Sequence, residues 1–141
     1  MEPVVLDERD DGVVVARWPR VVKDEATQQF FDDVQALLSR GRPMALVLDA
    51  TRVGPVSATV RRIAGKRLAQ QRAQRHLHLA AEATVIRNVL IRGVLTAIYW
   101  LAPPGYPNKV FSDLSEAEAW ASAQLGALRE RQPRTGESAG G

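Results

Sequence analysis

The sequence predicts one α/β domain built on a mostly parallel central sheet of about five strands, with an antiparallel strand at its N-terminus and about four helices. Three observations predict this fold. Short β-branched runs alternate along the chain with segments whose apolar residues recur at helical spacing. The run Met44–Leu48 is continuously apolar, as is typical of a strand buried on both faces. With 141 residues, 45% hydrophobic and 25% charged, the chain is ordinary in composition and large enough for a single core.

The first two strands are expected to form a hairpin. Residues 2–9 begin with a proline after Glu2, and a proline is tolerated at the start of an edge strand. Residues 10–12 are Asp-Asp-Gly, which is turn chemistry, and the β-branched run at 13–18 supplies the second strand.

A helix and the buried strand come next. Asp24 is expected to cap the helix, whose apolar residues recur at helical spacing up to Leu38, and Gly41 is expected to close it in the left-handed conformation. The strand Met44–Leu48 then leads into Asp49.

The second half of the chain alternates in the same way. Ser57 is expected to cap a helix that runs to about Leu79, after a loop at 51–56. The elements expected beyond it are a strand at 83–86, a helix at 89–101, a strand at 109–111 and a helix that carries Trp120, with Ser115 and Glu118 in capping-box spacing. This order implies right-handed crossovers. We expect the domain to span residues 1–127 and the polar residues 128–141 to form a disordered tail.

This element order, with Leu46-Val47-Leu48-Asp49 leading into a loop and a capped helix, resembles the STAS domain of sulfate transporters and anti-sigma-factor antagonists. It is most similar to the compact bacterial single-domain branch described as STAS-like, SpoIIAA-like or SEC14-like. The closing Val110-Phe111 strand and the Ala117-x-x-Trp120 helix are also similar to the end of that domain. The resemblance covers roughly residues 12–125 and implies a STAS-like fold and a regulatory, protein-binding role without a cofactor.

The resemblance departs from the family at the phosphorylation site. In the antagonist branch, an Asp-Ser pair stands at the N-terminus of the helix after this strand, and a partner kinase phosphorylates the serine. Counted from Asp49, the family's aspartate position falls on Ser57 and its phospho-serine position on Ala58. The resemblance therefore implies the fold but does not supply the phosphorylated residue.

The candidate site residues follow the buried strand. Ser57 has two interpretations: a helix cap worth about 1 kcal/mol, or a shifted phospho-acceptor, since a helix N-terminus and the nearby Arg61 favour negative charge. The candidates for partner contact or phosphorylation are Asp49, Thr51, Ser57, Thr59, Arg61 and Arg62.

The helix that Ser57 begins is basic, with no acidic residue before Glu82. Its cations spread around most of the helix circumference, which favours a solvated face; an anion or partner contact near the helix N-terminus is the alternative. These cations are Arg61, Arg62, Lys66, Arg67, Arg72 and Arg75.

The segment 89–101 is apolar on nearly every side, apart from Arg92. One stripe, which contains Leu90, Val94, Ile98 and Leu101, is expected to pack on the sheet. The other stripe consists of Ile91, Leu95 and Tyr99, and a single sheet cannot cover it. A homodimer interface, a hydrophobic ligand, a membrane surface or packing within the chain would each cover that stripe.

Several function classes are not favoured. The chain contains no cysteine, which excludes thiolate zinc sites and cysteine nucleophiles, and His76 and His78 stand two residues apart, the wrong spacing for a zinc pair on a helix. No phosphate-binding glycine loop or nucleophile elbow occurs, so neither a catalytic residue nor a metal is expected. A net charge of +3 with mixed signs does not favour nucleic acid. The N-terminal segment 1–11 is acidic and does not have the basic-then-apolar pattern of a secretion signal. We therefore expect a cytoplasmic protein.

The sequence thus predicts a non-catalytic regulatory module that binds a protein partner through residues 49–62 and dimerises through residues 89–101. The alternative hypothesis is a carrier or sensor of a lipid or other hydrophobic small molecule, because the same apolar helix would suit such a ligand.

Overall fold

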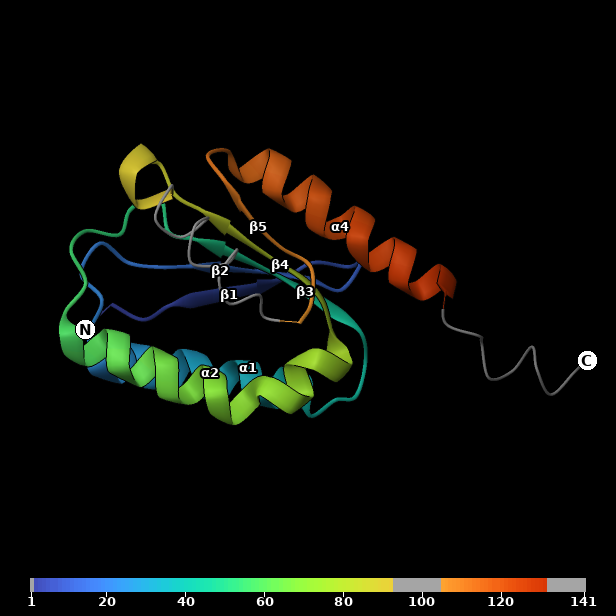
Figure 1. The fold of residues 1–141 in the computed structure, drawn as a ribbon, viewed down its shortest axis with the longest axis horizontal. Helices are drawn as coiled ribbons and strands as arrows, with labels where there is room; N and C mark the ends of the chain where they lie inside the picture. The colour runs from blue at the N-terminus through green and yellow to red at the C-terminus, as the bar shows by residue number, and fades with distance from the viewer. Residues whose placement is uncertain (1, 93–104, 132–141) are drawn as a thin grey trace, which may run out of the picture.

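The computed structural model describes residues 2–92 and 105–131. Figure 1 shows the elements in chain order: β1 (Val5–Glu8), β2 (Val13–Arg17), α1 (Asp24–Leu38), β3 (Met44–Asp49), α2 (Ala58–His78), β4 (Leu79–Val85), β5 (Asn108–Phe111) and α4 (Leu114–Arg131). A further helical turn begins at residue 89 and is described up to residue 92.

The strands form one mixed sheet in the order β1-β2-β3-β4-β5. Strand β1 pairs with β2 antiparallel, and the later neighbours pair parallel. In the turn between β1 and β2, the Asp11 carboxylate accepts a hydrogen bond from the Val13 amide and Gly12 has a φ of +93°. The predicted fold class, an antiparallel N-terminal strand on a parallel sheet, is therefore confirmed.

Helices cover both faces of the sheet (Figure 1). Helices α1 and α2 lie on one face, where Phe30, Phe31 and Val34 of α1 pack on β2 and β3. Helix α4 lies on the other face, and the ring of Trp120 packs on that of Phe111, with 5.6 Å between their centroids. All the residues from Val13 to Ala16 on β2 are buried, as expected for a strand that is covered on both sides.

Two predicted helix caps are wrong, and two are confirmed. Lys23 precedes α1 and makes no side-chain cap, so Asp24 is the first helical residue rather than its cap. Asp113 caps α4 by accepting a bond from the Glu116 amide, in place of the predicted Ser115 box. Ser57 caps α2 as predicted, and Gly41 has the expected left-handed φ of +70°.

The strand boundaries differ from the prediction mainly at β4. This strand begins at Leu79 rather than at residue 83, directly after α2, and all its residues are buried. Strand β1 is shorter than the predicted 2–9, and β5 starts one residue early. Helix α4 continues to Arg131, four residues past the predicted domain boundary at 127, and residues 132–141 lie outside the described part.

Arg75 of α2 does not belong to a solvated face, contrary to the prediction. It is 2% exposed, and its Nη1 donates to Glu82 Oε2 on β4 at 2.7 Å and to the Tyr106 hydroxyl at 3.3 Å. Its Nε donates to Gln71 Oε1 at 3.0 Å. Burial alone would lower the pKa of Arg75, but the attraction of Glu82 and Tyr106 outweighs it and raises that pKa. The pair is thus a charged contact inside the core.

Candidate functional site

The predicted site lies where the parallel strands end. Asp49 is the last residue of β3, and its carbonyl accepts a hydrogen bond from the amide of Trp18, the residue after β2. The next amide, of Ala50, donates to the Val85 carbonyl of β4. The loop after β3 is therefore held between the ends of its two neighbouring strands, at the edge where α/β sheets bind ligands.

Asp49 and Thr51 contact each other and form a small turn. The Asp49 Oδ1 atom accepts from the Thr51 amide at 3.1 Å and from the Thr51 hydroxyl at 2.7 Å. Both side chains are half-buried. Their mutual bonds shape the start of the loop, and this is a positioning role rather than a catalytic one.

Ser57 begins α2 and is exposed. Its Oγ accepts from the Val60 amide at 3.1 Å, so the hydroxyl still has a proton to donate. Arg61 is also exposed, and its Nη1 donates to the Val56 carbonyl at 2.7 Å. The guanidinium of Arg61 thus lies beside the residue that precedes Ser57.

Thr59 and Arg62 continue this surface toward α1. The Arg62 Nη2 atom donates to the Thr59 hydroxyl at 3.3 Å, and both residues are exposed. They line a shallow groove between α1 and α2, together with Gln28, Ile63, Lys66, Arg67 and Gln70. Arg67 bridges the two helices by bonding Gln28 and Asp32, at 2.7 Å to each side chain.

A second groove lies between the starts of α1 and α2. Its lining residues are Val21, Val22, Lys23, Asp24, Glu25, Pro55 and Ser57. Two helix N-termini therefore meet at one hollow, and the Gly54 amide donates to the Arg20 carbonyl at 2.9 Å to hold the two loops together. The contribution of residues 18–23 could not be predicted from the sequence, because no motif marks them and only the parallel topology brings them here.

The structure brings the six predicted residues from Asp49 to Arg62 into one loop and one helix turn. Their side-chain contacts form separate groups: Asp49 with Thr51, and Thr59 with Arg62. Within residues 2–92 and 105–131, no cluster of histidine, aspartate and glutamate side chains could hold a metal ion. The arrangement offers exposed cations and hydroxyls for binding, without a nucleophile that is activated by a neighbouring base.

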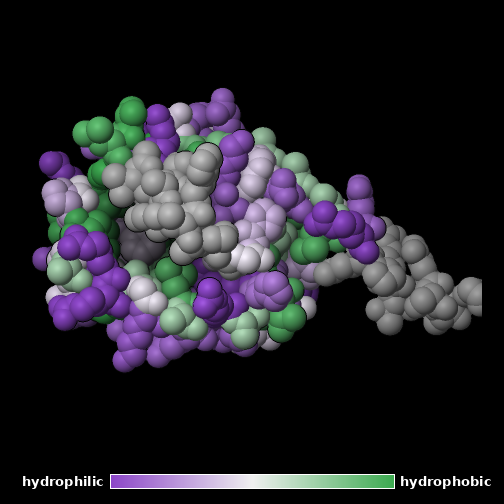
Figure 2. Space-filling view, in the orientation of Figure 1, coloured by the Kyte–Doolittle hydropathy of each residue, from purple (hydrophilic) through white to green (hydrophobic). Residues whose placement is uncertain are grey.

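The predicted apolar face is described only at its beginning. Ile91 is 49% exposed, while Leu95 and Tyr99 lie outside the described residues. Leu90 is 80% exposed, so the expectation that it packs on the sheet is wrong. In Figure 2 the surface at this helical turn, at the upper left, is hydrophobic. No helix in the described ranges is long and apolar enough to cross a membrane.

The fold has counterparts among solved structures. An uncharacterised protein of the DUF3478 family from Shewanella loihica PV-4, described as having a SpoIIAA-like fold, matches with a TM-score of 0.65 and 14% identity, over 84% of this chain and 91% of that one. This chain has a SpoIIAA-like fold. An anti-sigma factor antagonist from Mycobacterium paratuberculosis matches with a TM-score of 0.53 and 14% identity, over 84% and 92% of the two chains. No family model and no curated protein matches the sequence.

These likenesses confirm the STAS-like fold that the sequence predicts. Because the identity is 14% in both cases, they establish the fold and leave the site residues to be argued from this chain.

Proposed function

We propose that this SpoIIAA-like protein is a non-catalytic regulatory module that binds a protein partner through residues 49–62. The anti-sigma factor antagonist among its structural neighbours supports a regulatory, protein-binding role. A cytoplasmic location belongs to the same proposal.

The exposed start of α2 is the observation that carries this proposal. Its first turn contains no acidic residue, and Arg61 and Arg62 are exposed there beside the free hydroxyl proton of Ser57. The groove between α1 and α2 continues this surface past Lys66. A cationic helix start next to a groove fits an acidic segment of a partner, because the helix dipole and the guanidinium groups act in the same direction.

Phosphorylation of Ser57 is the regulatory step that this geometry favours. A phosphate on its Oγ would accept from the Val60 amide, as the hydroxyl oxygen already does, and would lie near Arg61. It would also neutralise the positive surface that the partner is proposed to bind. We therefore expect Ser57→Glu to weaken partner binding, and Ser57→Ala to preserve it.

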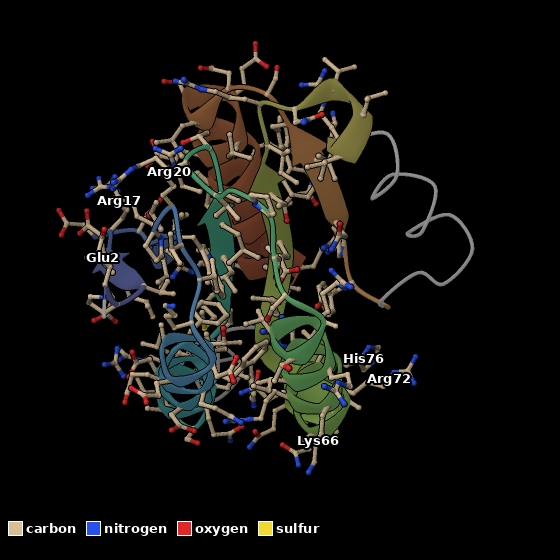
Figure 3. The ribbon with its side chains drawn as sticks, turned by 90° about the vertical axis from the view of Figure 1, so that its left-hand side faces the viewer. Glu2, Arg17, Arg20, Lys66, Arg72 and His76 are labelled. Carbon is tan, nitrogen blue, oxygen red and sulfur yellow. The ribbon has the colours of Figure 1, made fainter. Side chains whose placement is uncertain are left out.

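The test is quantitative affinity capture from the native cell, with wild type beside Arg62→Glu. Arg72→Glu is the matched control, because Arg72 is also exposed but lies farther along α2. Figure 3 looks nearly along α2 and shows Arg72 beside His76, on the side of that helix away from α1. A partner that Arg62→Glu loses and Arg72→Glu retains supports the proposal, once binding is reproduced with the two purified proteins. Equal recovery with both variants contradicts it.

Self-association through residues 89–101 is the second part of the proposal. Analytical ultracentrifugation of wild type and of Leu95→Asp tests it, since a charge in an apolar interface prevents association. A wild-type sedimentation coefficient that is monomeric at every concentration contradicts a homodimer.

A carrier of a hydrophobic small molecule is the alternative function, and one observation favours it. On β4 and β5, the Thr84 hydroxyl and both amide atoms of Asn108 are buried and make no hydrogen bond with the residues that the structure describes. Buried polar groups are normally bonded, so these atoms are available to the polar group of a ligand. Native mass spectrometry of freshly purified protein should then show an adduct, and a clean mass without a thermal shift from lipids excludes it.

A further inference from the structure

A small pocket lies at the end of the sheet opposite the proposed partner site. The turn between β1 and β2, the loop between α1 and β3, and the last turns of α4 enclose it, and these segments meet at the right of Figure 1. The parallel strands β2 and β3 begin here, whereas Asp49 and Ser57 follow the other end of β3. The volume of the pocket is about 200 Å³, which suits a small molecule rather than a peptide or a lipid.

The floor of the pocket is apolar. Val14 of β2, Leu37 of α1 and Met44 of β3 line it, and all three belong to the buried core. An apolar group of a ligand would cover the surface that these side chains still present to water, which is favourable.

Charged side chains of both signs form the wall, and some of them already have partners. The Arg40 Nη1 atom lies 2.6 Å from Glu8 Oε1, so these two wall residues neutralise each other. Arg9 lies 2.8 Å from Asp7 and 2.9 Å from Glu118, neither of which lines the pocket. The charges of these three wall residues are therefore compensated within the chain.

The other charged residues of the wall are left without such a partner. Within the described residues, Arg42, Arg129 and Asp10 form no ion pair, and all three are exposed. Arg129 attracts Asp11, but Asp11 does not line the pocket and both of its side-chain oxygens already accept hydrogen bonds. The pocket thus offers two guanidinium groups and one carboxylate to a ligand.

A glycine in the turn lets one of these cations reach the pocket. Gly12 has a φ of +93°, and a Cβ on it would lie 2.8 Å from Nη2 of Arg129. Because glycine has no side chain, this guanidinium can lie against the turn that also carries Asp10. A cation of α4 and a carboxylate of the turn therefore line the same pocket.

We propose that this pocket binds a free amino acid with an apolar side chain. The carboxylate of the ligand contacts Arg42 and Arg129, its ammonium group contacts Asp10, and its side chain lies on the apolar floor. A simple anion would leave Asp10 beside it without a partner, and a simple cation would be repelled by the two arginines. A ligand that carries both charges and an apolar group matches the floor and the wall together.

This proposal goes beyond the protein-binding role and uses none of the residues at 49–62. The test is an NMR titration of the isotope-labelled full chain with L-leucine, whose side chain is apolar like the floor. We expect the backbone amide signals of Gly12, Val14 and Met44 to shift, and those of Ser57 and Val60 to stay unchanged.

Three relatives of leucine test each contact separately. Isocaproate lacks the amino group, isoamylamine lacks the carboxylate, and glycine lacks the side chain. We expect each of them to bind about tenfold more weakly than leucine or worse. A hydrogen bond to a charged group and the burial of a leucine side chain each contribute roughly that factor.

Matched variants assign the contacts to the wall. Asp10→Asn and Arg42→Ala should each weaken leucine binding about tenfold. Their controls, Glu130→Gln and Arg131→Ala, change exposed charges of α4 that do not line the pocket, and they should bind leucine as wild type does. Circular dichroism verifies that each variant is folded.

Two kinds of result would contradict the proposal. It is overturned if leucine shifts none of the pocket signals, or if the control variants lose as much binding as the wall variants. Isocaproate that binds as tightly as leucine, with no effect of Asp10→Asn, would also overturn it and make the pocket a site for simple anions.

Discussion

The buried Arg75–Glu82 pair should contribute strongly to the free energy of unfolding. The side chains are 2% and 7% exposed, and their closest atoms are 2.7 Å apart. Glu82→Gln keeps the size of the side chain but removes its charge, which leaves the Arg75 guanidinium buried without a counter-ion. Breaking a buried pair in this way costs about 3–5 kcal/mol. A domain of this size has a free energy of unfolding of about 5–15 kcal/mol, so the variant should be severely destabilised.

Urea unfolding followed by circular dichroism measures this loss, with Asp32→Asn as the control. Asp32 also pairs with an arginine of α2, at 2.7 Å, but its side chain is 61% exposed, so its loss should cost less than about 1 kcal/mol. The double variant Arg75→Met with Glu82→Leu should lie within about 2 kcal/mol of wild type, because both charges leave the core together. If Glu82→Gln costs no more than Asp32→Asn, the reasoning about burial is refuted.

Three smaller predictions use the same unfolding assay. Ser57→Ala should cost about 1 kcal/mol, because it removes the oxygen that caps α2; an unchanged midpoint would show that the cap is not formed in solution. The hydrogen bond from Ser122 at 2.7 Å is the largest cause that lowers the pKa of Asp11 below its ordinary value of 3.8. The stabilisation that this hydrogen bond gives the folded protein is therefore fully present above the ordinary pKa of Asp11. It is lost as the pH falls through the lower pKa that Asp11 has in the folded protein. Ser122→Ala should be less stable than wild type at neutral pH, by less than about 1 kcal/mol because Asp11 is exposed, and the two proteins should converge in acid; a difference that persists there contradicts this assignment. Gly12→Ala should cost more than Gly41→Ala, although both glycines have positive φ. A Cβ at Gly12 would lie 3.2 Å from Cδ2 of the buried Leu125, whereas a Cβ at Gly41 would meet nothing within 4 Å. Equal losses would show that the φ angle alone sets the cost.

The fold could be predicted from the sequence because each local signal agrees with its neighbours. The apolar run at Met44–Leu48 and the alternation around it require a parallel sheet, and the structure confirms both. The errors lie where two signals compete. Asp113 and Ser115 are both good caps, and the helix begins after the first of them. At Leu79 the helical pattern and the strand pattern overlap, because α2 passes into β4 without a loop.

The buried Arg75 could not be predicted, because its role depends on the packing of α2 rather than on its own sequence. A helical wheel gives the relative directions of the six cations of α2 but not which of them faces the sheet. The sheet decides this: Leu46 of β3 and Asn108 of β5 flank Glu82 in register, so the carboxylate points into the layer that α2 covers. Glu82 within a buried strand was the available signal, since a carboxylate there requires a partner.

The candidate site shows the same division between local pattern and topology. Ser57 and its neighbours could be found from one stretch of sequence, because a cap and its helix are local. The edge with Arg20, Arg52 and Leu90 could not, since these residues lie in three separate loops and only parallel pairing of the strands gathers them. A parallel sheet places successive crossover loops at a shared edge whatever their sequences, so the charge of that edge is a property of the whole chain. In this protein the three loops are uniformly free of acidic residues while their neighbouring helices α1 and α4 begin with acidic ones. The helix starts account for the position of these carboxylates, because a helix N-terminus favours negative charge.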